Sequence, residues 1–210
     1  MWRLLSLSFM LISGFLANKK ALGSDSINHS DIELDLPKLQ QGPDKTNCGP
    51  SAAAIILAAY HAGDAPALRD LIGEWSWDKF TFRRLFGGGT SLEMLKASLN
   101  HFSNYVTFDT DDHPWIPREA WAVISLKANL QQHKPLVVLV DAKAFWGLPK
   151  ATGLHWIVVR GYKKGMVSFN DSADNSTGKI SISQFWDSWR IKKWSFWTPG
   201  FLALIPSKGL

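Results

Sequence analysis

The chain contains a single cysteine, Cys48, whose surroundings suit a reactive thiol. It lies in Asn47-Cys48-Gly49-Pro50-Ser51, between a turn-rich loop and an apolar, alanine-rich run. A helix that begins there would favour the thiolate form through its exposed N–H groups and macrodipole. Gly49 would let a substrate carbonyl approach the backbone, and the Cys48 N–H could face a developing oxyanion. We therefore interpret Cys48 as a nucleophile and Gly49 as part of the substrate site.

A cysteine nucleophile needs an imidazole that takes its proton and returns one to the leaving group. Of the six histidines, only His155 opens an apolar run, Trp156-Ile157-Val158-Val159. An imidazole without a partner would be costly in such a strand, because buried polar groups need hydrogen bonds. We predict that His155 is the general base and acid, and we place Trp156 beside it among the substrate-binding residues.

The third member of such a set accepts a hydrogen bond from the other imidazole nitrogen. Asn170-Asp171 ends an apolar run that a hairpin at Lys163-Lys164-Gly165 would lay beside the His155 strand. We predict that Asp171 is this acceptor, with Asn170 as the alternative, and we interpret Asp174 as a loop residue. Upstream of Cys48, Gln40 or Gln41 could donate a second hydrogen bond to the oxyanion.

The elements that must hold these residues follow from hydrophobic patterning. Residues 51–60 are almost wholly apolar and predict a buried central helix, with Pro50 in its first turn. Residues 91–99 predict a second helix that is capped by Thr90 or Ser91. Strand-like runs occupy 136–140, 155–159 and 166–169, with shorter candidates at 180–182 and 201–205 and a helical turn at 183–189. Residues 61–86 and 109–120 are interpreted as helical or irregular segments that cover the core.

The order of these elements, helices first and an antiparallel sheet afterwards, predicts an α+β fold. A content of 46% hydrophobic and 20% charged residues suits one globular domain and excludes disordered, collagen-like and coiled-coil classes. One cysteine also excludes a disulfide framework and a cysteine-rich zinc site. The predicted chemistry requires no metal or cofactor.

Residues 1–23 resemble an export signal, with Arg3 before an apolar stretch and small residues at Ala21-Leu22-Gly23. We expect cleavage before Ser24, with an uncleaved membrane anchor as the alternative, and a flexible lead-in over 24–35 before a domain at 36–210. Three of the five excess positive charges lie in residues 1–23, so the remainder is nearly balanced and a nucleic-acid partner is not expected.

Taken together, four segments resemble the C39-like peptidases of the papain superfamily over most of residues 36–190. The segments are Gln41 to Ser51, Gly89 to Leu95, Leu154 to Tyr162 and Val167 to Asp171. The resemblance implies a papain-like fold, a Cys48–His155 pair oriented by Asp171, and an oxyanion-hole glutamine best matched by Gln41. Gln41 lies one residue further from the cysteine than papain-type spacing.

The resemblance and the residues together predict an exported, monomeric cysteine peptidase or amidohydrolase that forms a thioester acyl-enzyme. The expected substrates are peptides, proteins or cell-wall peptides; an inhibitor or immunity protein could bind it, and the export signal would be its only membrane contact. An acyltransferase, a deamidase or a cell-wall amidase would use the same residues. An inactive binding module is a further alternative, suggested by the tryptophan-rich segment 185–197.

Overall fold

The computed structural model of the chain describes its residues in eight segments, which include every residue predicted for the site. They are 31–42, 46–60, 63–79, 89–103, 106–110, 118–148, 153–189 and 203–210. The predicted signal peptide at 1–23 lies outside the described residues. No helix within the described segments is long and apolar enough to cross a membrane.

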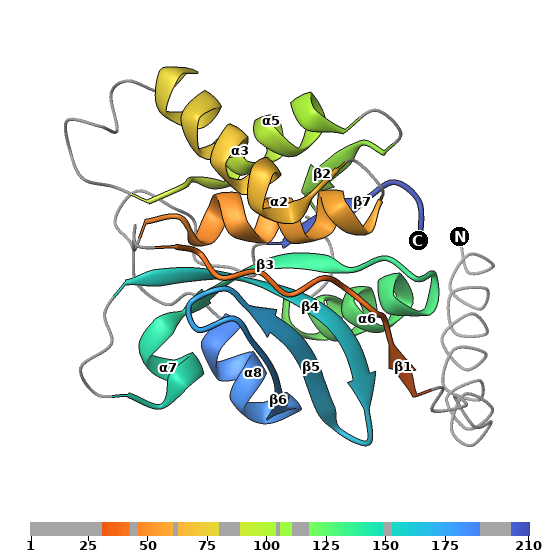
Figure 1. The fold of residues 1–210 in the computed structure, drawn as a ribbon. Coiled ribbons are helices and arrows are strands. Elements are labelled where there is room, and N and C mark those ends of the chain that lie inside the picture. Colours follow the sequence, from red (N-terminus) through yellow and green to blue (C-terminus); the bar gives the residue numbers. More distant parts are fainter. Residues whose placement is uncertain are drawn as a thin grey trace, which may run out of the picture. The chain divides into compact units, whose positions relative to one another are not determined.

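Helix α2 (Cys48–Ala59) is the central helix that the alanine-rich run predicts, and it begins at Cys48. Its first ten residues are all buried, because α3 (Ala65–Lys79) and α5 (Leu92–Phe102) pack on it from one side and the sheet packs from the other. Figure 1 shows α2 between these helices and the strands. A helix with apolar residues all round can be stable only in such surroundings.

The described strands form one antiparallel sheet in the order β2, β7, β3, β4, β5 and β6, with β1 beside β4. Their bounds are β1 (Ile32–Glu33), β2 (Phe108–Thr110), β3 (Leu136–Asp141), β4 (Leu154–Lys163), β5 (Met166–Asp171), β6 (Ser176–Ser181) and β7 (Ala203–Pro206). The helical part precedes most of this sheet, and the fold is α+β and papain-like. Strands β1 and β2 precede the predicted strands in the chain and were not themselves predicted.

The predicted hairpin joins β4 to β5 through Lys164 and Gly165, which both have positive φ, as a tight hairpin turn requires. Its register pairs Val158 with Asn170, so the next position along β5, Asp171, falls opposite Ile157. Side chains two residues apart on a strand point to the same face. The hairpin therefore places Asp171 diagonally across from His155, within reach of a long side chain.

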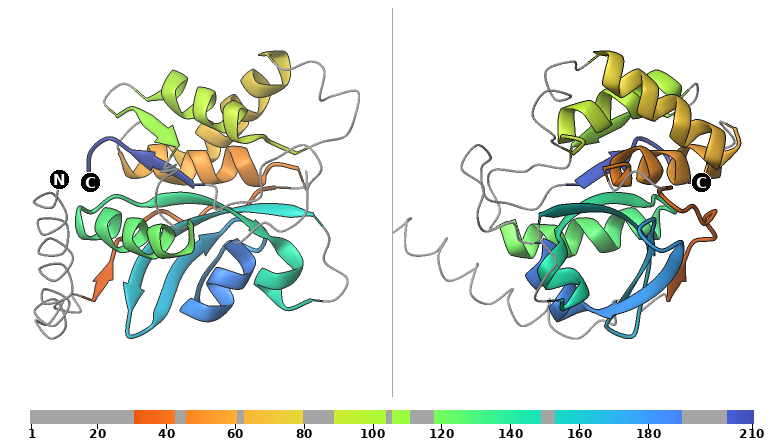
Figure 2. Two further views of the ribbon diagram at one scale, coloured as in Figure 1. Left: turned by 180° about the vertical axis from the view of Figure 1, so that it is seen from behind. Right: turned by 60° about the vertical axis from the view of Figure 1, so that its left-hand side comes forward.

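Three further helices cover the face of the sheet opposite α2: α6 (Arg118–Gln131), α7 (Ala142–Trp146) and α8 (Ile182–Trp189). Figure 2 shows both layers from behind and from the side. Helix α8 corresponds to the helical turn predicted at 183–189. Helix α7 was not predicted, although Asp141 caps its N-terminus and Gly147 ends it with a φ of 63°, which are ordinary helix boundary signals.

The chain before α2 lies along the sheet. Within the lead-in expected over 24–35, Ile32 and Glu33 pair with β4 as β1, and Leu34 is 6% exposed. Arg160 on β4 reinforces this pairing, since it forms an ion pair with Glu33 and donates a hydrogen bond to the Leu34 carbonyl. Beyond β1, Leu36 and Leu39 are also buried, so the segment reaches the site along a fixed path.

Candidate active site

Cys48 is the first residue of α2, and its side chain is 7% exposed. The preceding residue, Asn47, makes no side-chain hydrogen bond to the first turn, and no acidic side chain lies in that turn. The partial positive charge of the helix N-terminus is therefore not neutralised locally. Cys48 is thus at the helix N-terminus where the sequence analysis placed it.

Gly49 is held in close contact with the loop before α5. A Cβ at this position would collide with the side chain of Thr90, so only glycine fits without movement. The space on the Cβ side of Gly49 is thus filled by Thr90. The role of Gly49 seen here is close packing at the head of α2.

Trp156 lies in the core and does not face the site. Its side chain is 1% exposed, and its indole N–H donates to the Thr90 carbonyl at 2.9 Å. No ring surface remains for the substrate contact that we predicted. Trp156 instead fixes Thr90 by this hydrogen bond, and Thr90 packs on Gly49. Through these two contacts, Trp156 supports the position of the neighbouring Cys48.

His155 is the second residue of β4 and is 5% exposed. Its Nε2 lies 2.7 Å from Oδ1 of Asp171. Burial by itself lowers the pKa of an imidazole, but hydrogen bonding and charge from Asp171 and Cys48 outweigh burial and raise the pKa of His155 to about 9. The imidazole is therefore a cation at neutral pH and stands between the thiol and the carboxylate.

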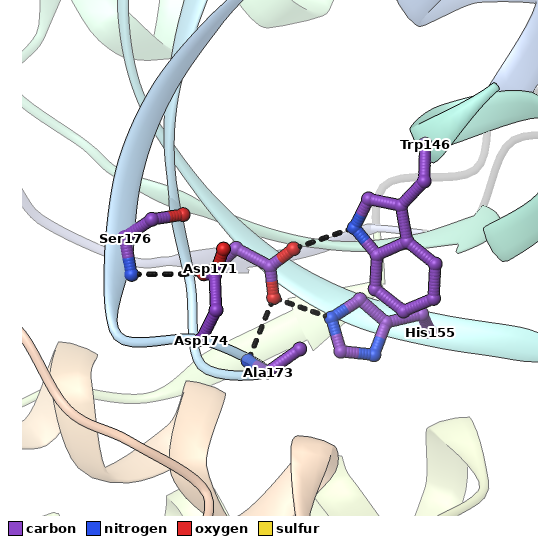
Figure 3. A network of polar contacts seen from close by, with 6 residues as sticks. All are labelled: Trp146, His155, Asp171, Ala173, Asp174 and Ser176. Carbon is purple, nitrogen blue, oxygen red and sulfur yellow. Dashed lines mark hydrogen bonds and ion pairs between the residues drawn. The ribbon is translucent and has the colours of Figure 1, made fainter. Parts of the chain in front are cut away.

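Asp171, the last residue of β5, receives three hydrogen bonds in all, as Figure 3 shows. Its Oδ1 accepts from His155 and from the Ala173 backbone N–H at 2.8 Å, and its Oδ2 accepts from the Trp146 indole N–H at 2.8 Å. Burial raises the pKa of this carboxyl. These donors and the imidazolium charge lower the pKa by more than burial raises it, so the net shift is downward. Asp171 is thus held as a carboxylate.

The two alternatives to Asp171 have other contacts. The Asn170 amide donates to the Pro37 carbonyl at 2.9 Å and is not bonded to His155. Asp174 is exposed, and its carboxylate accepts from the Ser176 backbone N–H within the turn after β5 (Figure 3). Of the three candidates, only Asp171 contacts the imidazole.

Trp146, at the end of α7, belongs to the site but was not predicted. Its ring centroid lies 4.8 Å from that of His155, and its N–H bonds Asp171, so the indole covers the His155–Asp171 pair. Trp146 as a whole remains 37% exposed. A helix predicted between Asp141 and Gly147 would have brought this residue near the start of β4.

Gln41 reaches the same end of the sheet. Its backbone N–H donates to the Ser172 carbonyl, beside Asp171, at 2.8 Å. Its side-chain oxygen is buried without a partner, and its amide nitrogen makes no hydrogen bond to the described residues. Gln40 is exposed, and its carbonyl accepts from Arg69 on α3 at 2.8 Å. Gln41 therefore has a side-chain amide that is not engaged by the described residues, whereas Gln40 lies exposed on the side of α3.

The structure thus brings together Cys48, His155 and Asp171, from a helix N-terminus and two adjacent strands. A cysteine sulfur, an imidazole and a carboxylate in this order are the groups needed to attack an acyl carbon and protonate a leaving group. No group of three or more histidine, cysteine, aspartate or glutamate side chains that could hold a metal ion occurs within the described segments.

Comparison with known proteins gives a consistent picture. One similar solved structure is that of a candidate C39-like peptidase from Bacillus anthracis, with a TM-score of 0.58, 14% identity, and coverage of 85% of this chain and 98% of that one. Another is a double glycine motif protease from an AMS/PCAT transporter in complex with the leader peptide, with a TM-score of 0.53, 14% identity, and coverage of 85% and 97%. No curated protein sequence matches the chain.

At such low identity, the two structures establish the fold alone. The family follows from the sequence, because the profile of the Peptidase_C39 like family matches residues 33–194. That range spans most of the chain and contains Gln41, Cys48, His155 and Asp171. The chain belongs to the Peptidase_C39 like family.

Proposed function

We propose that this protein is an exported cysteine peptidase that hydrolyses amide bonds through Cys48, His155 and Asp171. The observation that carries the proposal is the position of His155, which interacts with Cys48 and with Asp171 in a buried site. A structural histidine in the core would need one partner, whereas a proton carrier needs a nucleophile on one side and an orienting group on the other.

In the acylation step, the Cys48 thiolate attacks the substrate carbonyl carbon and forms a C–S bond. The C–N bond then breaks, and His155 gives its proton to the departing amine. Asp171 keeps the imidazole in one orientation and stabilises its positive charge. The Cys48 N–H and the Gln41 amide are the proposed donors to the oxyanion, because both lie at the N-terminal end of α2 or in the segment that leads to it.

In the deacylation step, His155 removes a proton from a water molecule, which attacks the thioester carbonyl. The C–S bond breaks, the carboxylic acid product leaves, and the Cys48 thiolate and the imidazolium are restored. The chemistry needs no further reactant. Export is inferred from the signal-like segment 1–23, and the proposed substrates are therefore peptides, proteins or cell-wall peptides outside the cytoplasm.

The proposal can be tested with the purified full-length chain and a proteome-derived peptide library, with products identified by mass spectrometry. We expect new peptide termini from the native protein and none from Cys48→Ala, which should fold normally because the change removes one atom. Leu71→Ser is the matched control, since Leu71 is 51% exposed on α3. It should cleave like the native protein.

The same experiment separates the competing reactions. Acyl transfer would give products joined to an added amine, and deamidation would raise peptide masses by about one dalton without new termini. Either result would replace the peptidase proposal while keeping the residues. Full activity of Cys48→Ala would reject Cys48 as the nucleophile, and an inert native protein would favour a binding module.

A further inference from the structure

We propose that Trp146 and Leu148 form an apolar subsite that binds a large hydrophobic residue on the leaving-group side of the scissile bond. The inference rests on the proposed function, because a leaving group exists only if Cys48 is acylated. It assigns a substrate preference that the three reacting side chains by themselves do not define.

Exposed large apolar side chains are rare in the described part of the chain. They are Leu71, Ile124, Trp146, Leu148 and Leu210. Leu71, Ile124 and Leu210 lie on separate elements, whereas Trp146 and Leu148 are two residues apart and 37% and 55% exposed. Two chain steps keep their Cα atoms within about 7 Å of each other. Exposed apolar groups that lie together next to reactive side chains indicate a binding surface.

Trp146 is held by contacts on the protein side, so its exposed part is a preorganised surface for a ligand. Its indole N–H is bonded to Asp171, and its ring lies against His155 at 4.8 Å (Figure 3). The preceding residue, Phe145, is 3% exposed and packs on Phe169, which anchors α7 to the sheet. A ligand that binds such a surface does not have to order it first.

The position next to His155 identifies the side of the substrate that binds there. Asp171 occupies Nε2 of His155, so the proton for the leaving amine must come from Nδ1, the nitrogen that remains to serve Cys48. The amine and the residue attached to it therefore pass close to the imidazole during acylation. Trp146 covers that imidazole, and Leu148 follows it in the loop toward β4.

The preference can be read from the cleavage sites of the purified full-length chain in the peptide library. We expect Leu, Ile, Met and Phe to be enriched after the scissile bond, with kcat/KM about tenfold higher for a leaving-side Leu than for Ala in matched peptides. Leu148→Ser should reduce this ratio at least threefold. Leu71→Ser, which changes a similarly exposed leucine on α3, should leave it unchanged.

Trp146→Phe separates the subsite from the catalytic contact, because it keeps an aromatic ring but loses the N–H that bonds Asp171. It should lower the rate on both peptides and keep most of the preference for Leu. Cleavage by the native protein without a leaving-side preference, or an unchanged preference in Leu148→Ser, would overturn the inference and leave the proposed function standing. Absence of any cleavage by the native protein would overturn both.

Discussion

The helical side and the sheet side of the site are held by different kinds of contact. Cys48 is positioned by packing: α2 is buried on all sides, its N-terminus has no side-chain cap, and Thr90 presses on Gly49. His155 and Asp171 are equally buried but are positioned by directional hydrogen bonds. A change of volume should therefore damage the helical side, and the loss of a donor or acceptor should damage the sheet side.

The largest effect is expected where most hydrogen bonds meet. Asp171→Ala removes the acceptor of three donors and leaves His155 buried without its orienting partner. We predict a loss in kcat/KM of about 10⁴-fold, in line with the loss of an orienting acid elsewhere. Asn170→Ala is the matched control on the same strand, because Asn170 bonds Pro37 and not His155. Equal losses in the two variants would contradict the account.

Asp171→Asn keeps the approximate shape of the side chain but replaces the charge and one acceptor oxygen by an amide NH2 group, so its effect should appear in the pH profile. His155 must be protonated to serve the leaving amine, and its pKa is raised to about 9, so native kcat/KM should fall as the pH rises through 9. Without the carboxylate charge, burial lowers the pKa of His155 more effectively, and the fall should begin at a lower pH. An unchanged alkaline limb would show that Asp171 does not stabilise the imidazolium.

On the helical side, the corresponding variant is Gly49→Ala. The added Cβ would collide with Thr90, so we predict destabilisation of about 2 kcal/mol, seen as a lower Tm, together with reduced activity. Thr90→Gly in the same chain removes the colliding atoms and should restore much of both losses. A double variant no better than Gly49→Ala would mean that the contact does not limit this position.

Loss of a single donor should have a smaller effect on the sheet side. Trp146→Phe removes one hydrogen bond to a carboxylate, and we predict a loss in kcat/KM of about tenfold with little change in Tm. The two values separate catalysis from packing. A large fall in Tm with an unaltered kcat/KM would reverse the assignment and make Trp146 a packing residue.

The smallest effect is expected at the segment around Gln40 and Gln41, which precedes α2 and contacts both α3 and the end of β5. Arg69→Ala removes the hydrogen bond from α3 to the Gln40 carbonyl, and kcat/KM should fall about threefold if Gln41 then shifts. The same change should have no effect in a Gln41→Ala background, because the residue it positions is already absent. Additive losses in the double variant would remove Arg69 from the account.

Sequence patterns predicted the parts of the site that depend on local structure. The apolar run after Pro50 indicated a helix that begins near Cys48, and the hairpin signal at Lys164-Gly165 set His155 and Asp171 on adjacent strands. These inferences succeed because helix caps and hairpin turns depend on neighbouring residues.

The contacts that could not be predicted join residues far apart in the chain. The Trp146 N–H meets Asp171 across 25 positions, and the Trp156 N–H meets the Thr90 carbonyl across 66. Trp156 was expected to contact the substrate but is buried in the core. Alternation along a strand shows that His155 and Trp156 face opposite sides of the sheet, but it does not show which side another layer covers. The pairing of β1 involves only two residues, which is too short for any periodic pattern.

The central claim is that the His155 imidazole is shared between the Cys48 sulfur and the Asp171 carboxylate. The most direct test is an NMR titration of the His155 ring nitrogens in the native protein and in Cys48→Ala. We predict a native midpoint of about 9 and a lower midpoint in Cys48→Ala, because the thiol's hydrogen bond and charge are then lost. A native midpoint at or below the ordinary histidine value of about 6.5, or the same midpoint in both proteins, would contradict the account.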